Sequence, residues 1–339
     1  MILLKYIFII VFFVIVSAPP LLRAQLLRDQ RQHALILRGI DQTLQQEYDT
    51  AENTFQSFIK EFPMHPAGYL YLAGMLQAKN TDFGDRFNED RYDSLLNAVV
   101  DLAESLIQNP SSRAEGYFYT GSAEAFRSYT RSENGNLPSG IYYGLSAGAS
   151  MERCLEADPG FFEAKNILGS FYYWRSKMAW IPFIPDRTRE GIDMIMKSHA
   201  HPYEKHLASH NLMVILTEEK RYAEAERYGL SMLTEYPENR LFLWNMVTLY
   251  EKWGRNSHLQ TAVERLLAST LKANVINRYT EASCRLKLAR FAMERGNNSA
   301  AKEELLRVNA LQQFVGSTKG NLKKKIGQAN DLLKTIERR

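Results

Sequence analysis

The sequence contains very little cysteine, with Cys154 and Cys284 as the only two among 339 residues. Two cysteines 130 positions apart cannot form the disulfide framework of a small secreted domain, and they lack any metal-ligand spacing. We expect both to lie inside the protein, reduced, as small apolar side chains. The chain also lacks a strand pattern of any length, which argues against a β-rich fold.

Strong charge of either sign is missing as well. The formal net charge is +4, from 42 basic and 38 acidic residues, and it falls to +2 without Lys5 and Arg23. Such a mild balance argues against nucleic acid as the main ligand. Catalytic patterns are also missing, since there is no G-x-S-x-G motif and no cysteine close to a histidine in the sequence. We therefore expect a non-enzymatic protein that needs no cofactor.

An apolar run, Tyr6–Val16, stands near the N-terminus and is followed by two prolines that break any helix. The run is short for a membrane span, which takes about 20 residues. A charged start, a short apolar run and a small-residue exit are typical of a signal peptide. We expect cleavage after Ala24, with 1–24 as the signal peptide, and an exported protein of the periplasm or cell envelope. The alternative is an uncleaved N-terminal anchor.

Prolines divide the rest of the chain into repeated units. Five of them each follow an amphipathic run, with gaps of 47, 49, 43 and 35 residues: Pro63, Pro110, Pro159, Pro202 and Pro237. A helix should end just before each one, because proline has no amide hydrogen and clashes with the preceding turn. Four have an alanine twelve residues earlier, where a small side chain allows close helix packing: Ala51, Ala98, Ala147 and Ala225. In the Pro202 unit Glu190 stands twelve residues earlier, which leaves the register of this unit open, and the adjacent Gly191 is the candidate for the small residue.

A second kind of helix is expected after each proline, with apolar residues at helical spacing. In one such segment Leu168 and Tyr172 flank Gly169. Glycine costs a helix interior about 1 kcal/mol relative to alanine, so close packing should compensate for it. We therefore expect a neighbouring helix to cross at Gly169.

The order Leu-Gly-x-x-Tyr, a later alanine and a closing proline resembles the tetratricopeptide repeat (TPR), and 206–239 matches it without an insertion. The resemblance implies an all-α, right-handed superhelical solenoid of about six to seven TPR-like helical hairpins over 25–309. We expect 310–339 to form a basic C-terminal capping helix. Because the first gaps exceed the family's repeat of about 34 residues, we expect inserted loops within three hairpins, at 79–93, 130–140 and 178–188.

In similar proteins the first helix of each hairpin lines a concave groove, which implies a peptide or protein segment as the partner. One face of those helices offers aromatic, amide and hydroxyl groups: Tyr117, Asn166, Ser170, Tyr173, His210, Trp244 and Thr248. Each of these side chains could equally belong to the packing between helices. The alternative function is a structural accessory subunit of a membrane-associated envelope complex.

Such an accessory would be seated through the basic C-terminal helix and a loop containing two prolines and four large apolar residues, Trp180, Ile181, Phe183 and Ile184. This loop is too apolar for a solvated connection. We expect it to fold back and cover part of the core. Otherwise it contacts a partner or a membrane surface.

Two further patterns have an ordinary structural explanation that we favour. His206 and His210 have the i, i+4 spacing of a metal-binding pair, but no H-E-x-x-H motif accompanies them. We expect a polar helix face and no metal. Gly140, Gly144 and Gly148 have the spacing of a membrane-helix dimer motif. Charged residues follow them closely, so we expect tight packing inside the solenoid.

Overall fold

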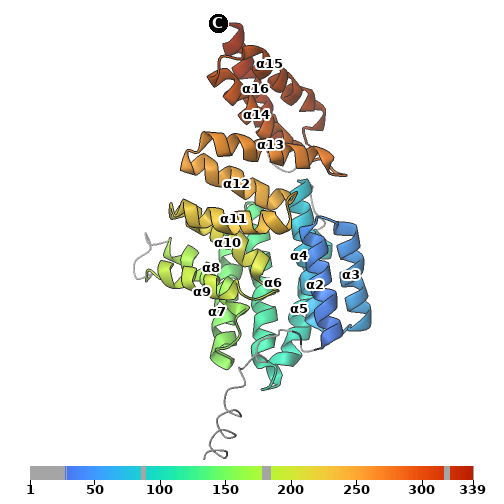
Figure 1. Cartoon of the computed structure of the whole chain (residues 1–339). Coiled ribbons are helices and arrows are strands. Elements are labelled where there is room, and N and C mark those ends of the chain that lie inside the picture. The colour runs from blue at the N-terminus through green and yellow to red at the C-terminus, as the bar shows by residue number, and fades with distance from the viewer. Residues whose placement is uncertain (1–26, 28, 85–88, 178–184, 317–320, 339) are drawn as a thin grey trace, which may run out of the picture.

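The computed structural model describes residues 27, 29–84, 89–177, 185–316 and 321–338 (Figure 1). The expected signal peptide at 1–24 and the loop Trp180–Ile184 lie outside these residues. The described residues form fifteen α-helices and one short 3-10 helix, and no strand occurs among them. The helices are α2 Gln30–Leu44, α3 Tyr48–Glu61, α4 Pro66–Phe83, α5 Glu89–Gln108, α6 Arg113–Glu133, α7 Leu137–Ala157, α8 Ala164–Ser176, α9 Thr188–Ser198, α10 Lys205–Glu218, α11 Tyr222–Glu235, α12 Arg240–Trp253, α13 Asn256–Lys272, α14 Arg278–Glu294, α15 Asn298–Asn309, η1 Ala310–Phe314 and α16 Leu322–Glu337.

Each helix packs against the next one in the chain, so the helices form consecutive hairpins, beginning with α2–α3 and ending with α14–α15. The even-numbered helices also pack on one another in the order α2, α4, α6, α8, α10 and α12, and α16 packs on α14 and α15. The predicted all-helical solenoid of stacked hairpins is confirmed. In the described ranges, no helix is both long and apolar enough to cross a membrane.

The prolines end helices as predicted. Helices α3, α5, α7, α9 and α11 stop within four residues of the proline that follows them. The alanines at 51, 147 and 225 are 0–2% exposed, whereas Ala98 is only partly buried. Proline therefore sets the end of the second helix in these hairpins, and in three of them the small side chain lies in the core.

Gly169 lies where two helices cross, as predicted. A Cβ atom built on Gly169 of α8 would lie 2.5 Å from the backbone oxygen of Gly191 on α9. The reverse also holds, with a Cβ atom on Gly191 lying 2.5 Å from the Gly169 oxygen. The backbones of α8 and α9 touch here, so Gly191 does replace the alanine of the other hairpins.

The prediction of inserted loops is wrong for two of the three hairpins. Helices α4 and α5 are 18 and 20 residues long and α6 and α7 are 21 each, whereas α10 and α11 have 14 residues each. The connection between α6 and α7 is only 134–136. The extra residues continue the helices because partners extend beside them: Arg131 of α6 bonds Glu89 at 3.0 Å and Asp93 at 2.5 Å, both on α5.

The glycines at 140, 144 and 148 lie within the packing between helices, as expected. A Cβ atom on Gly140 would lie 2.1 Å from Ser132 Oγ of α6, and one on Gly148 would lie 2.5 Å from the Phe171 ring of α8. A Cβ atom on Gly144 would lie 3.1 Å from Ser128 Oγ of α6. The motif therefore seats α7 between its two neighbours.

The apolar core runs along the solenoid in three clusters. The first spans α2 to α8, the second α8 to α14 and the third α14 to α16. Cys154 belongs to the first cluster and Cys284 to the second, and both are buried and free. The described helices are thus held together by successive clusters rather than by a single nucleus, as is typical of a repeat protein.

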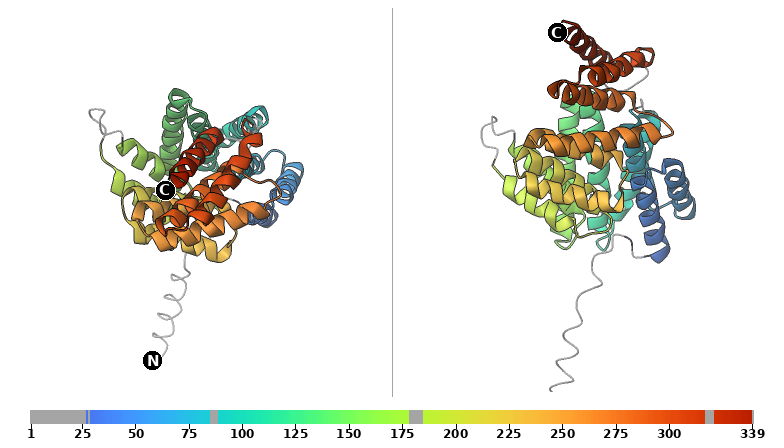
Figure 2. Two further views of the ribbon diagram at one scale, coloured as in Figure 1. Left: turned by 90° about the horizontal axis from the view of Figure 1, so that it is seen from above. Right: turned by 45° about the horizontal axis from the view of Figure 1, so that its top comes forward.

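The stack of hairpins curves until its early and late members meet. Helix α12 packs against α4, and the end of α2 and the turn after it accept bonds from the start of α12. Seen from above, the hairpins from α2 to α13 surround a common centre, and the C-terminal helices stand on one end (Figure 2). The even-numbered helices α2 to α12 thus form the inner wall of a nearly closed turn.

Candidate functional site on the inner face

A group of polar and aromatic side chains gathers on the inner wall where α8 and α10 begin. Glu163 is the N-cap residue of α8 and Glu204 is the N-cap residue of α10, and they are 1% and 3% exposed. The positive end of each helix dipole favours a carboxylate at this position. We call the group the inner polar cluster, and it consists of His33, Tyr71, Tyr119, Glu163, Asn166, His201, Tyr203, Glu204 and Asn211.

Amide groups link the two helices within this cluster. The Asn166 amide donates to Glu204 Oε2 at 2.8 Å, and the Asn211 amide donates to Asn166 Oδ1 at 2.9 Å. Burial raises the pKa of Glu204 to about 8, and the nearby Glu163 acts in the same direction, whereas the Asn166 bond lowers it. Glu204 therefore keeps its proton near neutral pH in the folded chain.

The connection between α9 and α10 reaches into the centre of the turn. Tyr203 is 0% exposed, and its hydroxyl group bonds Nδ1 of His33 on α2. Its ring meets the His33 ring edge-on at 5.5 Å and lies 6.4 Å from the Tyr71 ring of α4. The protein's own side chains thus occupy the inner face between α2, α4 and α8.

Two residues that the sequence analysis assigned to the groove are buried in the structure. Tyr173 is 0% exposed and its hydroxyl group donates to Glu219 at 2.8 Å, while Asn166 is 1% exposed within the cluster. Neither side chain offers surface to a partner. Tyr117 is partly buried on α6 and lies 5.9 Å below the guanidinium group of Arg153 on α7. It belongs to the contact between α6 and α7.

The other assigned residues lie on α8, α10 and α12 and keep accessible surface. Ser170 is partly exposed, and its hydroxyl oxygen accepts a bond from Asn211 at 3.1 Å. His210 Nδ1 accepts a bond from the Asn245 amide at 2.8 Å, which joins α10 to α12. We call the partly exposed set on these two helices the α10–α12 face, which consists of His206, His210, Trp244, Asn245 and Thr248.

The two histidines of this face are held neutral. Burial, together with the nearby His210, lowers the pKa of His206 to about 4, and burial lowers the pKa of His210 as well. Within the described residues, no group of three or more histidine, cysteine, aspartate or glutamate side chains is placed to hold a metal ion. The pair therefore offers neutral imidazole groups for hydrogen bonding.

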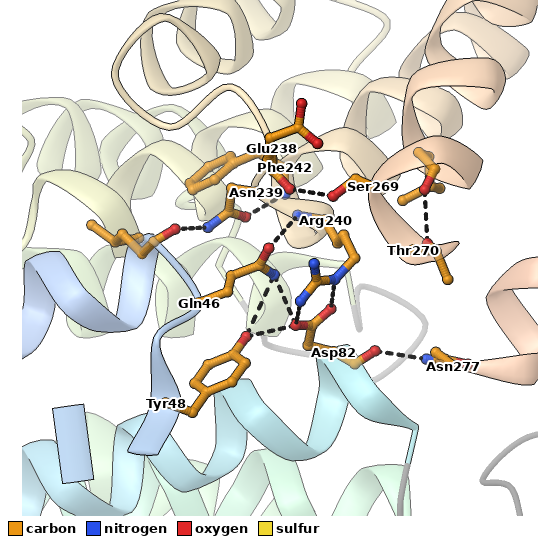
Figure 3. A network of polar contacts seen from close by, with 12 residues as sticks. Gln46, Tyr48, Asp82, Glu238, Asn239, Arg240, Phe242, Ser269, Thr270 and Asn277 are labelled. Atoms are coloured by element: carbon orange, nitrogen blue, oxygen red, sulfur yellow. Dashed lines mark hydrogen bonds and ion pairs between the residues drawn. The ribbon is translucent and has the colours of Figure 1, made fainter. Parts of the chain in front are cut away.

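A second polar network closes the turn (Figure 3). Arg240 at the start of α12 forms a two-pronged pair with Asp82 of α4, with Nε donating to Oδ1 at 2.6 Å and Nη2 donating to Oδ2. Asp82 Oδ2 also accepts bonds from the Tyr48 hydroxyl group and the Gln46 amide, both at 2.9 Å. Four donor groups, two from Arg240 and two from the stretch 46–48, therefore converge on one buried carboxylate.

Two amide side chains extend the same seam on either side of this pair. Asn239 donates to the Leu44 carbonyl oxygen at 2.7 Å, and Asn277 donates to the Asp82 carbonyl oxygen at 3.0 Å. These contacts could not be predicted from local patterns, because the partners lie 195 positions apart. The sequence analysis likewise did not single out Glu163, Tyr203 or Glu204.

Comparison with known proteins gives only a general likeness. No protein-family model matches the sequence, and no curated protein matches it. Among solved structures, the chain is similar to PilW, a type IV pilus biogenesis factor, with 14% identity over 91% of this chain and 99% of that one and a TM-score of 0.42. A tetratricopeptide repeat protein from Parabacteroides merdae has 14% identity over 89% and 100% of the two chains, at a TM-score of 0.41.

The human IFIT1 dimer with m7Gppp-AAAA has 12% identity over 91% of this chain and 84% of that one, at a TM-score of 0.38. The packing of the hairpins described above, rather than this likeness, defines the fold.

Proposed function

We propose that this chain is a non-enzymatic scaffold that holds a peptide or protein segment on the α10–α12 face. The supporting observation is that His206, His210, Trp244, Asn245 and Thr248 all keep accessible surface on adjacent inner helices. Amide, imidazole and hydroxyl groups can bond a peptide backbone, and an indole ring supplies contact area. The nearby turn is braced by the Asp82–Arg240 pair, so the face should be largely preformed.

An enzymatic role has weaker support. Burial raises the pKa of the Glu204 carboxyl group to about 8, but Glu204 is only 3% exposed. A general acid or base must come within hydrogen-bond reach of a substrate. Burial of Glu204 denies it that access.

We place this scaffold in the periplasm or cell envelope, on the basis of the expected signal peptide. The partner can be sought there with the mature chain as bait and a photo-crosslinking amino acid at position 248 of α12. Cross-links from this position to one defined segment of one protein would support the proposal. Cross-linking that is equal from position 248 and from an outer position such as 230 would contradict it.

Affinity for the segment found in this way can then be measured with purified components. Trp244→Ala should weaken binding about tenfold or more if the indole ring is a central contact. Leu230→Ala, on the outer helix α11 and 47% exposed before substitution, is the matched control and should bind normally. Unchanged affinity for Trp244→Ala, with the helical content intact, would contradict binding on this face.

The second candidate function, an accessory subunit seated on a membrane, has one observation in its favour. Burial together with the nearby Lys287, Arg290 and Lys324 lowers the pKa of Lys325, so cationic groups of α14 and α16 gather in one place, where Glu251 pairs with Lys287 alone. Such a patch favours an anionic surface. Flotation with vesicles tests this role, since binding to anionic vesicles that Lys324→Glu abolishes supports it. Equal binding to zwitterionic vesicles contradicts it.

A further inference from the structure

One helix carries an exposed apolar stripe. Among the described residues thirteen large apolar side chains are exposed, and four of them lie on α7, whereas no other helix carries more than one. These four are 48–67% exposed and follow helical spacing along one face, and we call them the α7 stripe: Leu137, Ile141, Tyr142 and Leu145. No charged residue stands between Glu133 and Glu152 to interrupt the stripe. Single exposed apolar residues are ordinary, but a contiguous patch marks an interaction site.

The stripe is exposed because the next hairpin is short. Helix α7 has 21 residues, whereas α8 and α9 have 13 and 11. At a rise of about 1.5 Å per residue, α7 is about 15 Å longer than α9. Helix α8 meets α7 in its later half, at Gly148 and Glu152, and among the described helices only α6 and α8 contact α7. The first half of α7 therefore lacks an outer neighbour within the described ranges.

An apolar cleft lies elsewhere on the outer surface, between α11 and α13, which do not contact each other. Buried side chains that include Met246, Tyr250 and Ala262 form its floor, while Leu230 and Thr261 are exposed at its edges. We call it the α11–α13 cleft. Its volume is about 220 Å³, below the range of about 300–1,000 Å³ that is usual for small-molecule pockets. A cleft of this kind suits a large apolar side chain of another protein.

The two surfaces lie in halves of the chain that carry opposite charge. Residues 25–163, which include the α7 stripe, contain 11 basic and 20 acidic residues, a net charge of −9. Residues 164–339, which include the α11–α13 cleft, contain 29 basic and 18 acidic residues, a net charge of +11. An acidic surrounding disfavours an anionic membrane as the cover of the stripe. It favours a basic protein surface, and the second half of this chain is one.

The charges closest to the stripe along the chain follow the same division. Three of the four charged residues in 133–157 are acidic, namely Glu133, Glu152 and Glu156. The fourth, Arg153, lies over the Tyr117 ring at 5.9 Å. The ends of the stripe are therefore mainly acidic.

Cations stand beside the cleft. Arg255 and Arg265 of α13 both act electrostatically on Tyr250 in its floor. Within the described ranges neither pairs with a carboxylate, since Arg265 donates to a backbone carbonyl oxygen at 3.0 Å and Arg255 lies 3.6 Å above an indole ring. Two carboxylates of the same region already accept bonds from uncharged donors, Glu226 from the Tyr250 hydroxyl group and Glu264 from a glutamine amide. Positive charge thus remains for the carboxylates of a partner.

We propose that the α7 stripe of one copy docks into the α11–α13 cleft of a second copy, so that copies of this chain join head to tail. Seen from above, α7 lies on the opposite side of the turn from α11 and α13, so the two surfaces do not meet within one chain (Figure 2). Because different surfaces meet, each added copy leaves a cleft or a stripe open for the next. The inference is independent of the segment held on the α10–α12 face.

Three leucines of similar exposure provide a matched test in the mature chain. Leu145 belongs to the stripe, Leu230 lies at the cleft and Leu306 lies on α15 away from both, and they are 52%, 47% and 51% exposed. In sedimentation equilibrium the average mass of the unsubstituted chain and of Leu306→Glu should rise with concentration beyond that of a dimer. Leu145→Glu and Leu230→Glu, with unchanged helical content, should each remain monomeric. An unsubstituted chain that stays monomeric at every concentration overturns the proposal.

A mixture of the two interrupted variants distinguishes a head-to-tail contact from a symmetric one. Leu145→Glu keeps an intact cleft and Leu230→Glu keeps an intact stripe. An equimolar mixture should therefore form a dimer and nothing larger, although each variant alone is monomeric. A mixture that remains monomeric overturns the proposal. So does self-association of Leu230→Glu alone, because stripes would then pair with each other.

A photo-crosslinking amino acid at position 142 locates the contact with the cleft unsubstituted, and so decides the matter if a glutamate variant does not fold. In a mixture of isotopically light and heavy chains, this position should cross-link to residues 257–265 of another copy. Cross-links from position 230 should correspondingly reach α7 of another copy rather than the partner of the α10–α12 face. Cross-links from position 142 that stay within one chain, or that join two stripes, overturn the proposal.

Discussion

Loss of the Arg240 guanidinium group should open the seam between α4 and α12. The Asp82 side chain is 1% exposed and that of Arg240 is 12% exposed, so the pair is largely shielded from water. In Arg240→Met the carboxylate would keep only the Tyr48 and Gln46 bonds, each 2.9 Å long. Removal of one partner from a buried pair costs about 3–5 kcal/mol, because the remaining charge is uncompensated. That is a large part of a total stability of about 5–15 kcal/mol.

Urea unfolding measures the loss in the free energy of unfolding, and hydrogen exchange shows which helices become less stable. Amides at the start of α12 and the end of α4 should exchange faster, since local opening of the seam becomes easier. Lys252→Met is the matched control. Lys252 on α12 also forms an ion pair with a carboxylate on another helix, Glu218 of α10, but both side chains are more than 40% exposed. It should cost at most about 1 kcal/mol. Equal costs for the two variants would refute the reasoning.

Three further outcomes follow from the packing and from the buried groups. Gly169→Ala should lower the free energy of unfolding by about 1–3 kcal/mol, because its Cβ atom would lie 2.5 Å from a backbone oxygen. Gly327→Ala is the control and should be neutral or stabilising, because a Cβ atom there would have no other atom within 4 Å. A lower urea midpoint for Gly327→Ala than for Gly169→Ala would contradict this. Glu204 holds its proton up to about pH 8 in the folded chain, but only up to about pH 4.5 in the unfolded chain. The free energy of unfolding should therefore fall as pH rises from about 4.5 to about 8, and Glu204→Gln should abolish that fall in urea titrations. Burial raises the pKa of Cys284 to about 12 and raises that of Cys154 further. Neither thiol should therefore react with a disulfide reagent before the chain unfolds. Fast labelling of the native chain would contradict the buried placement of both cysteines.

The local features of the fold could be predicted from the sequence because their causes are local. A proline ends a helix wherever it occurs, so helix ends near Pro63 and Pro237 followed from covalent geometry. A glycine between apolar helix positions indicated a close crossing, and Gly169 does touch Gly191. The lengths of α6 and α7 were missed, because a loop and a helical extension have similar polar compositions until the neighbouring helix is known.

The closure of the turn and the filling of its centre could not be predicted in this way. Arg240 and Asp82 are 158 positions apart, and neither stands in a distinctive pattern. Whether Tyr173 and His210 face inward or between helices depends on small rotations between hairpins, which accumulate along the stack. Helical spacing could not indicate that Tyr173 is fully buried or that His210 bonds Asn245 of the next inner helix.

The central claim is that the stacked hairpins close into one turn, which is held at the seam where α2 and α4 meet the start of α12. The most direct test is the distance between spin labels at positions 45 and 238, which are the neighbours of the bonded pair Leu44 and Asn239. The buried native cysteines should not take up the label. We expect one short, narrow distance in native buffer that lengthens and broadens in urea. A long or broad distribution in native buffer would contradict the closed turn.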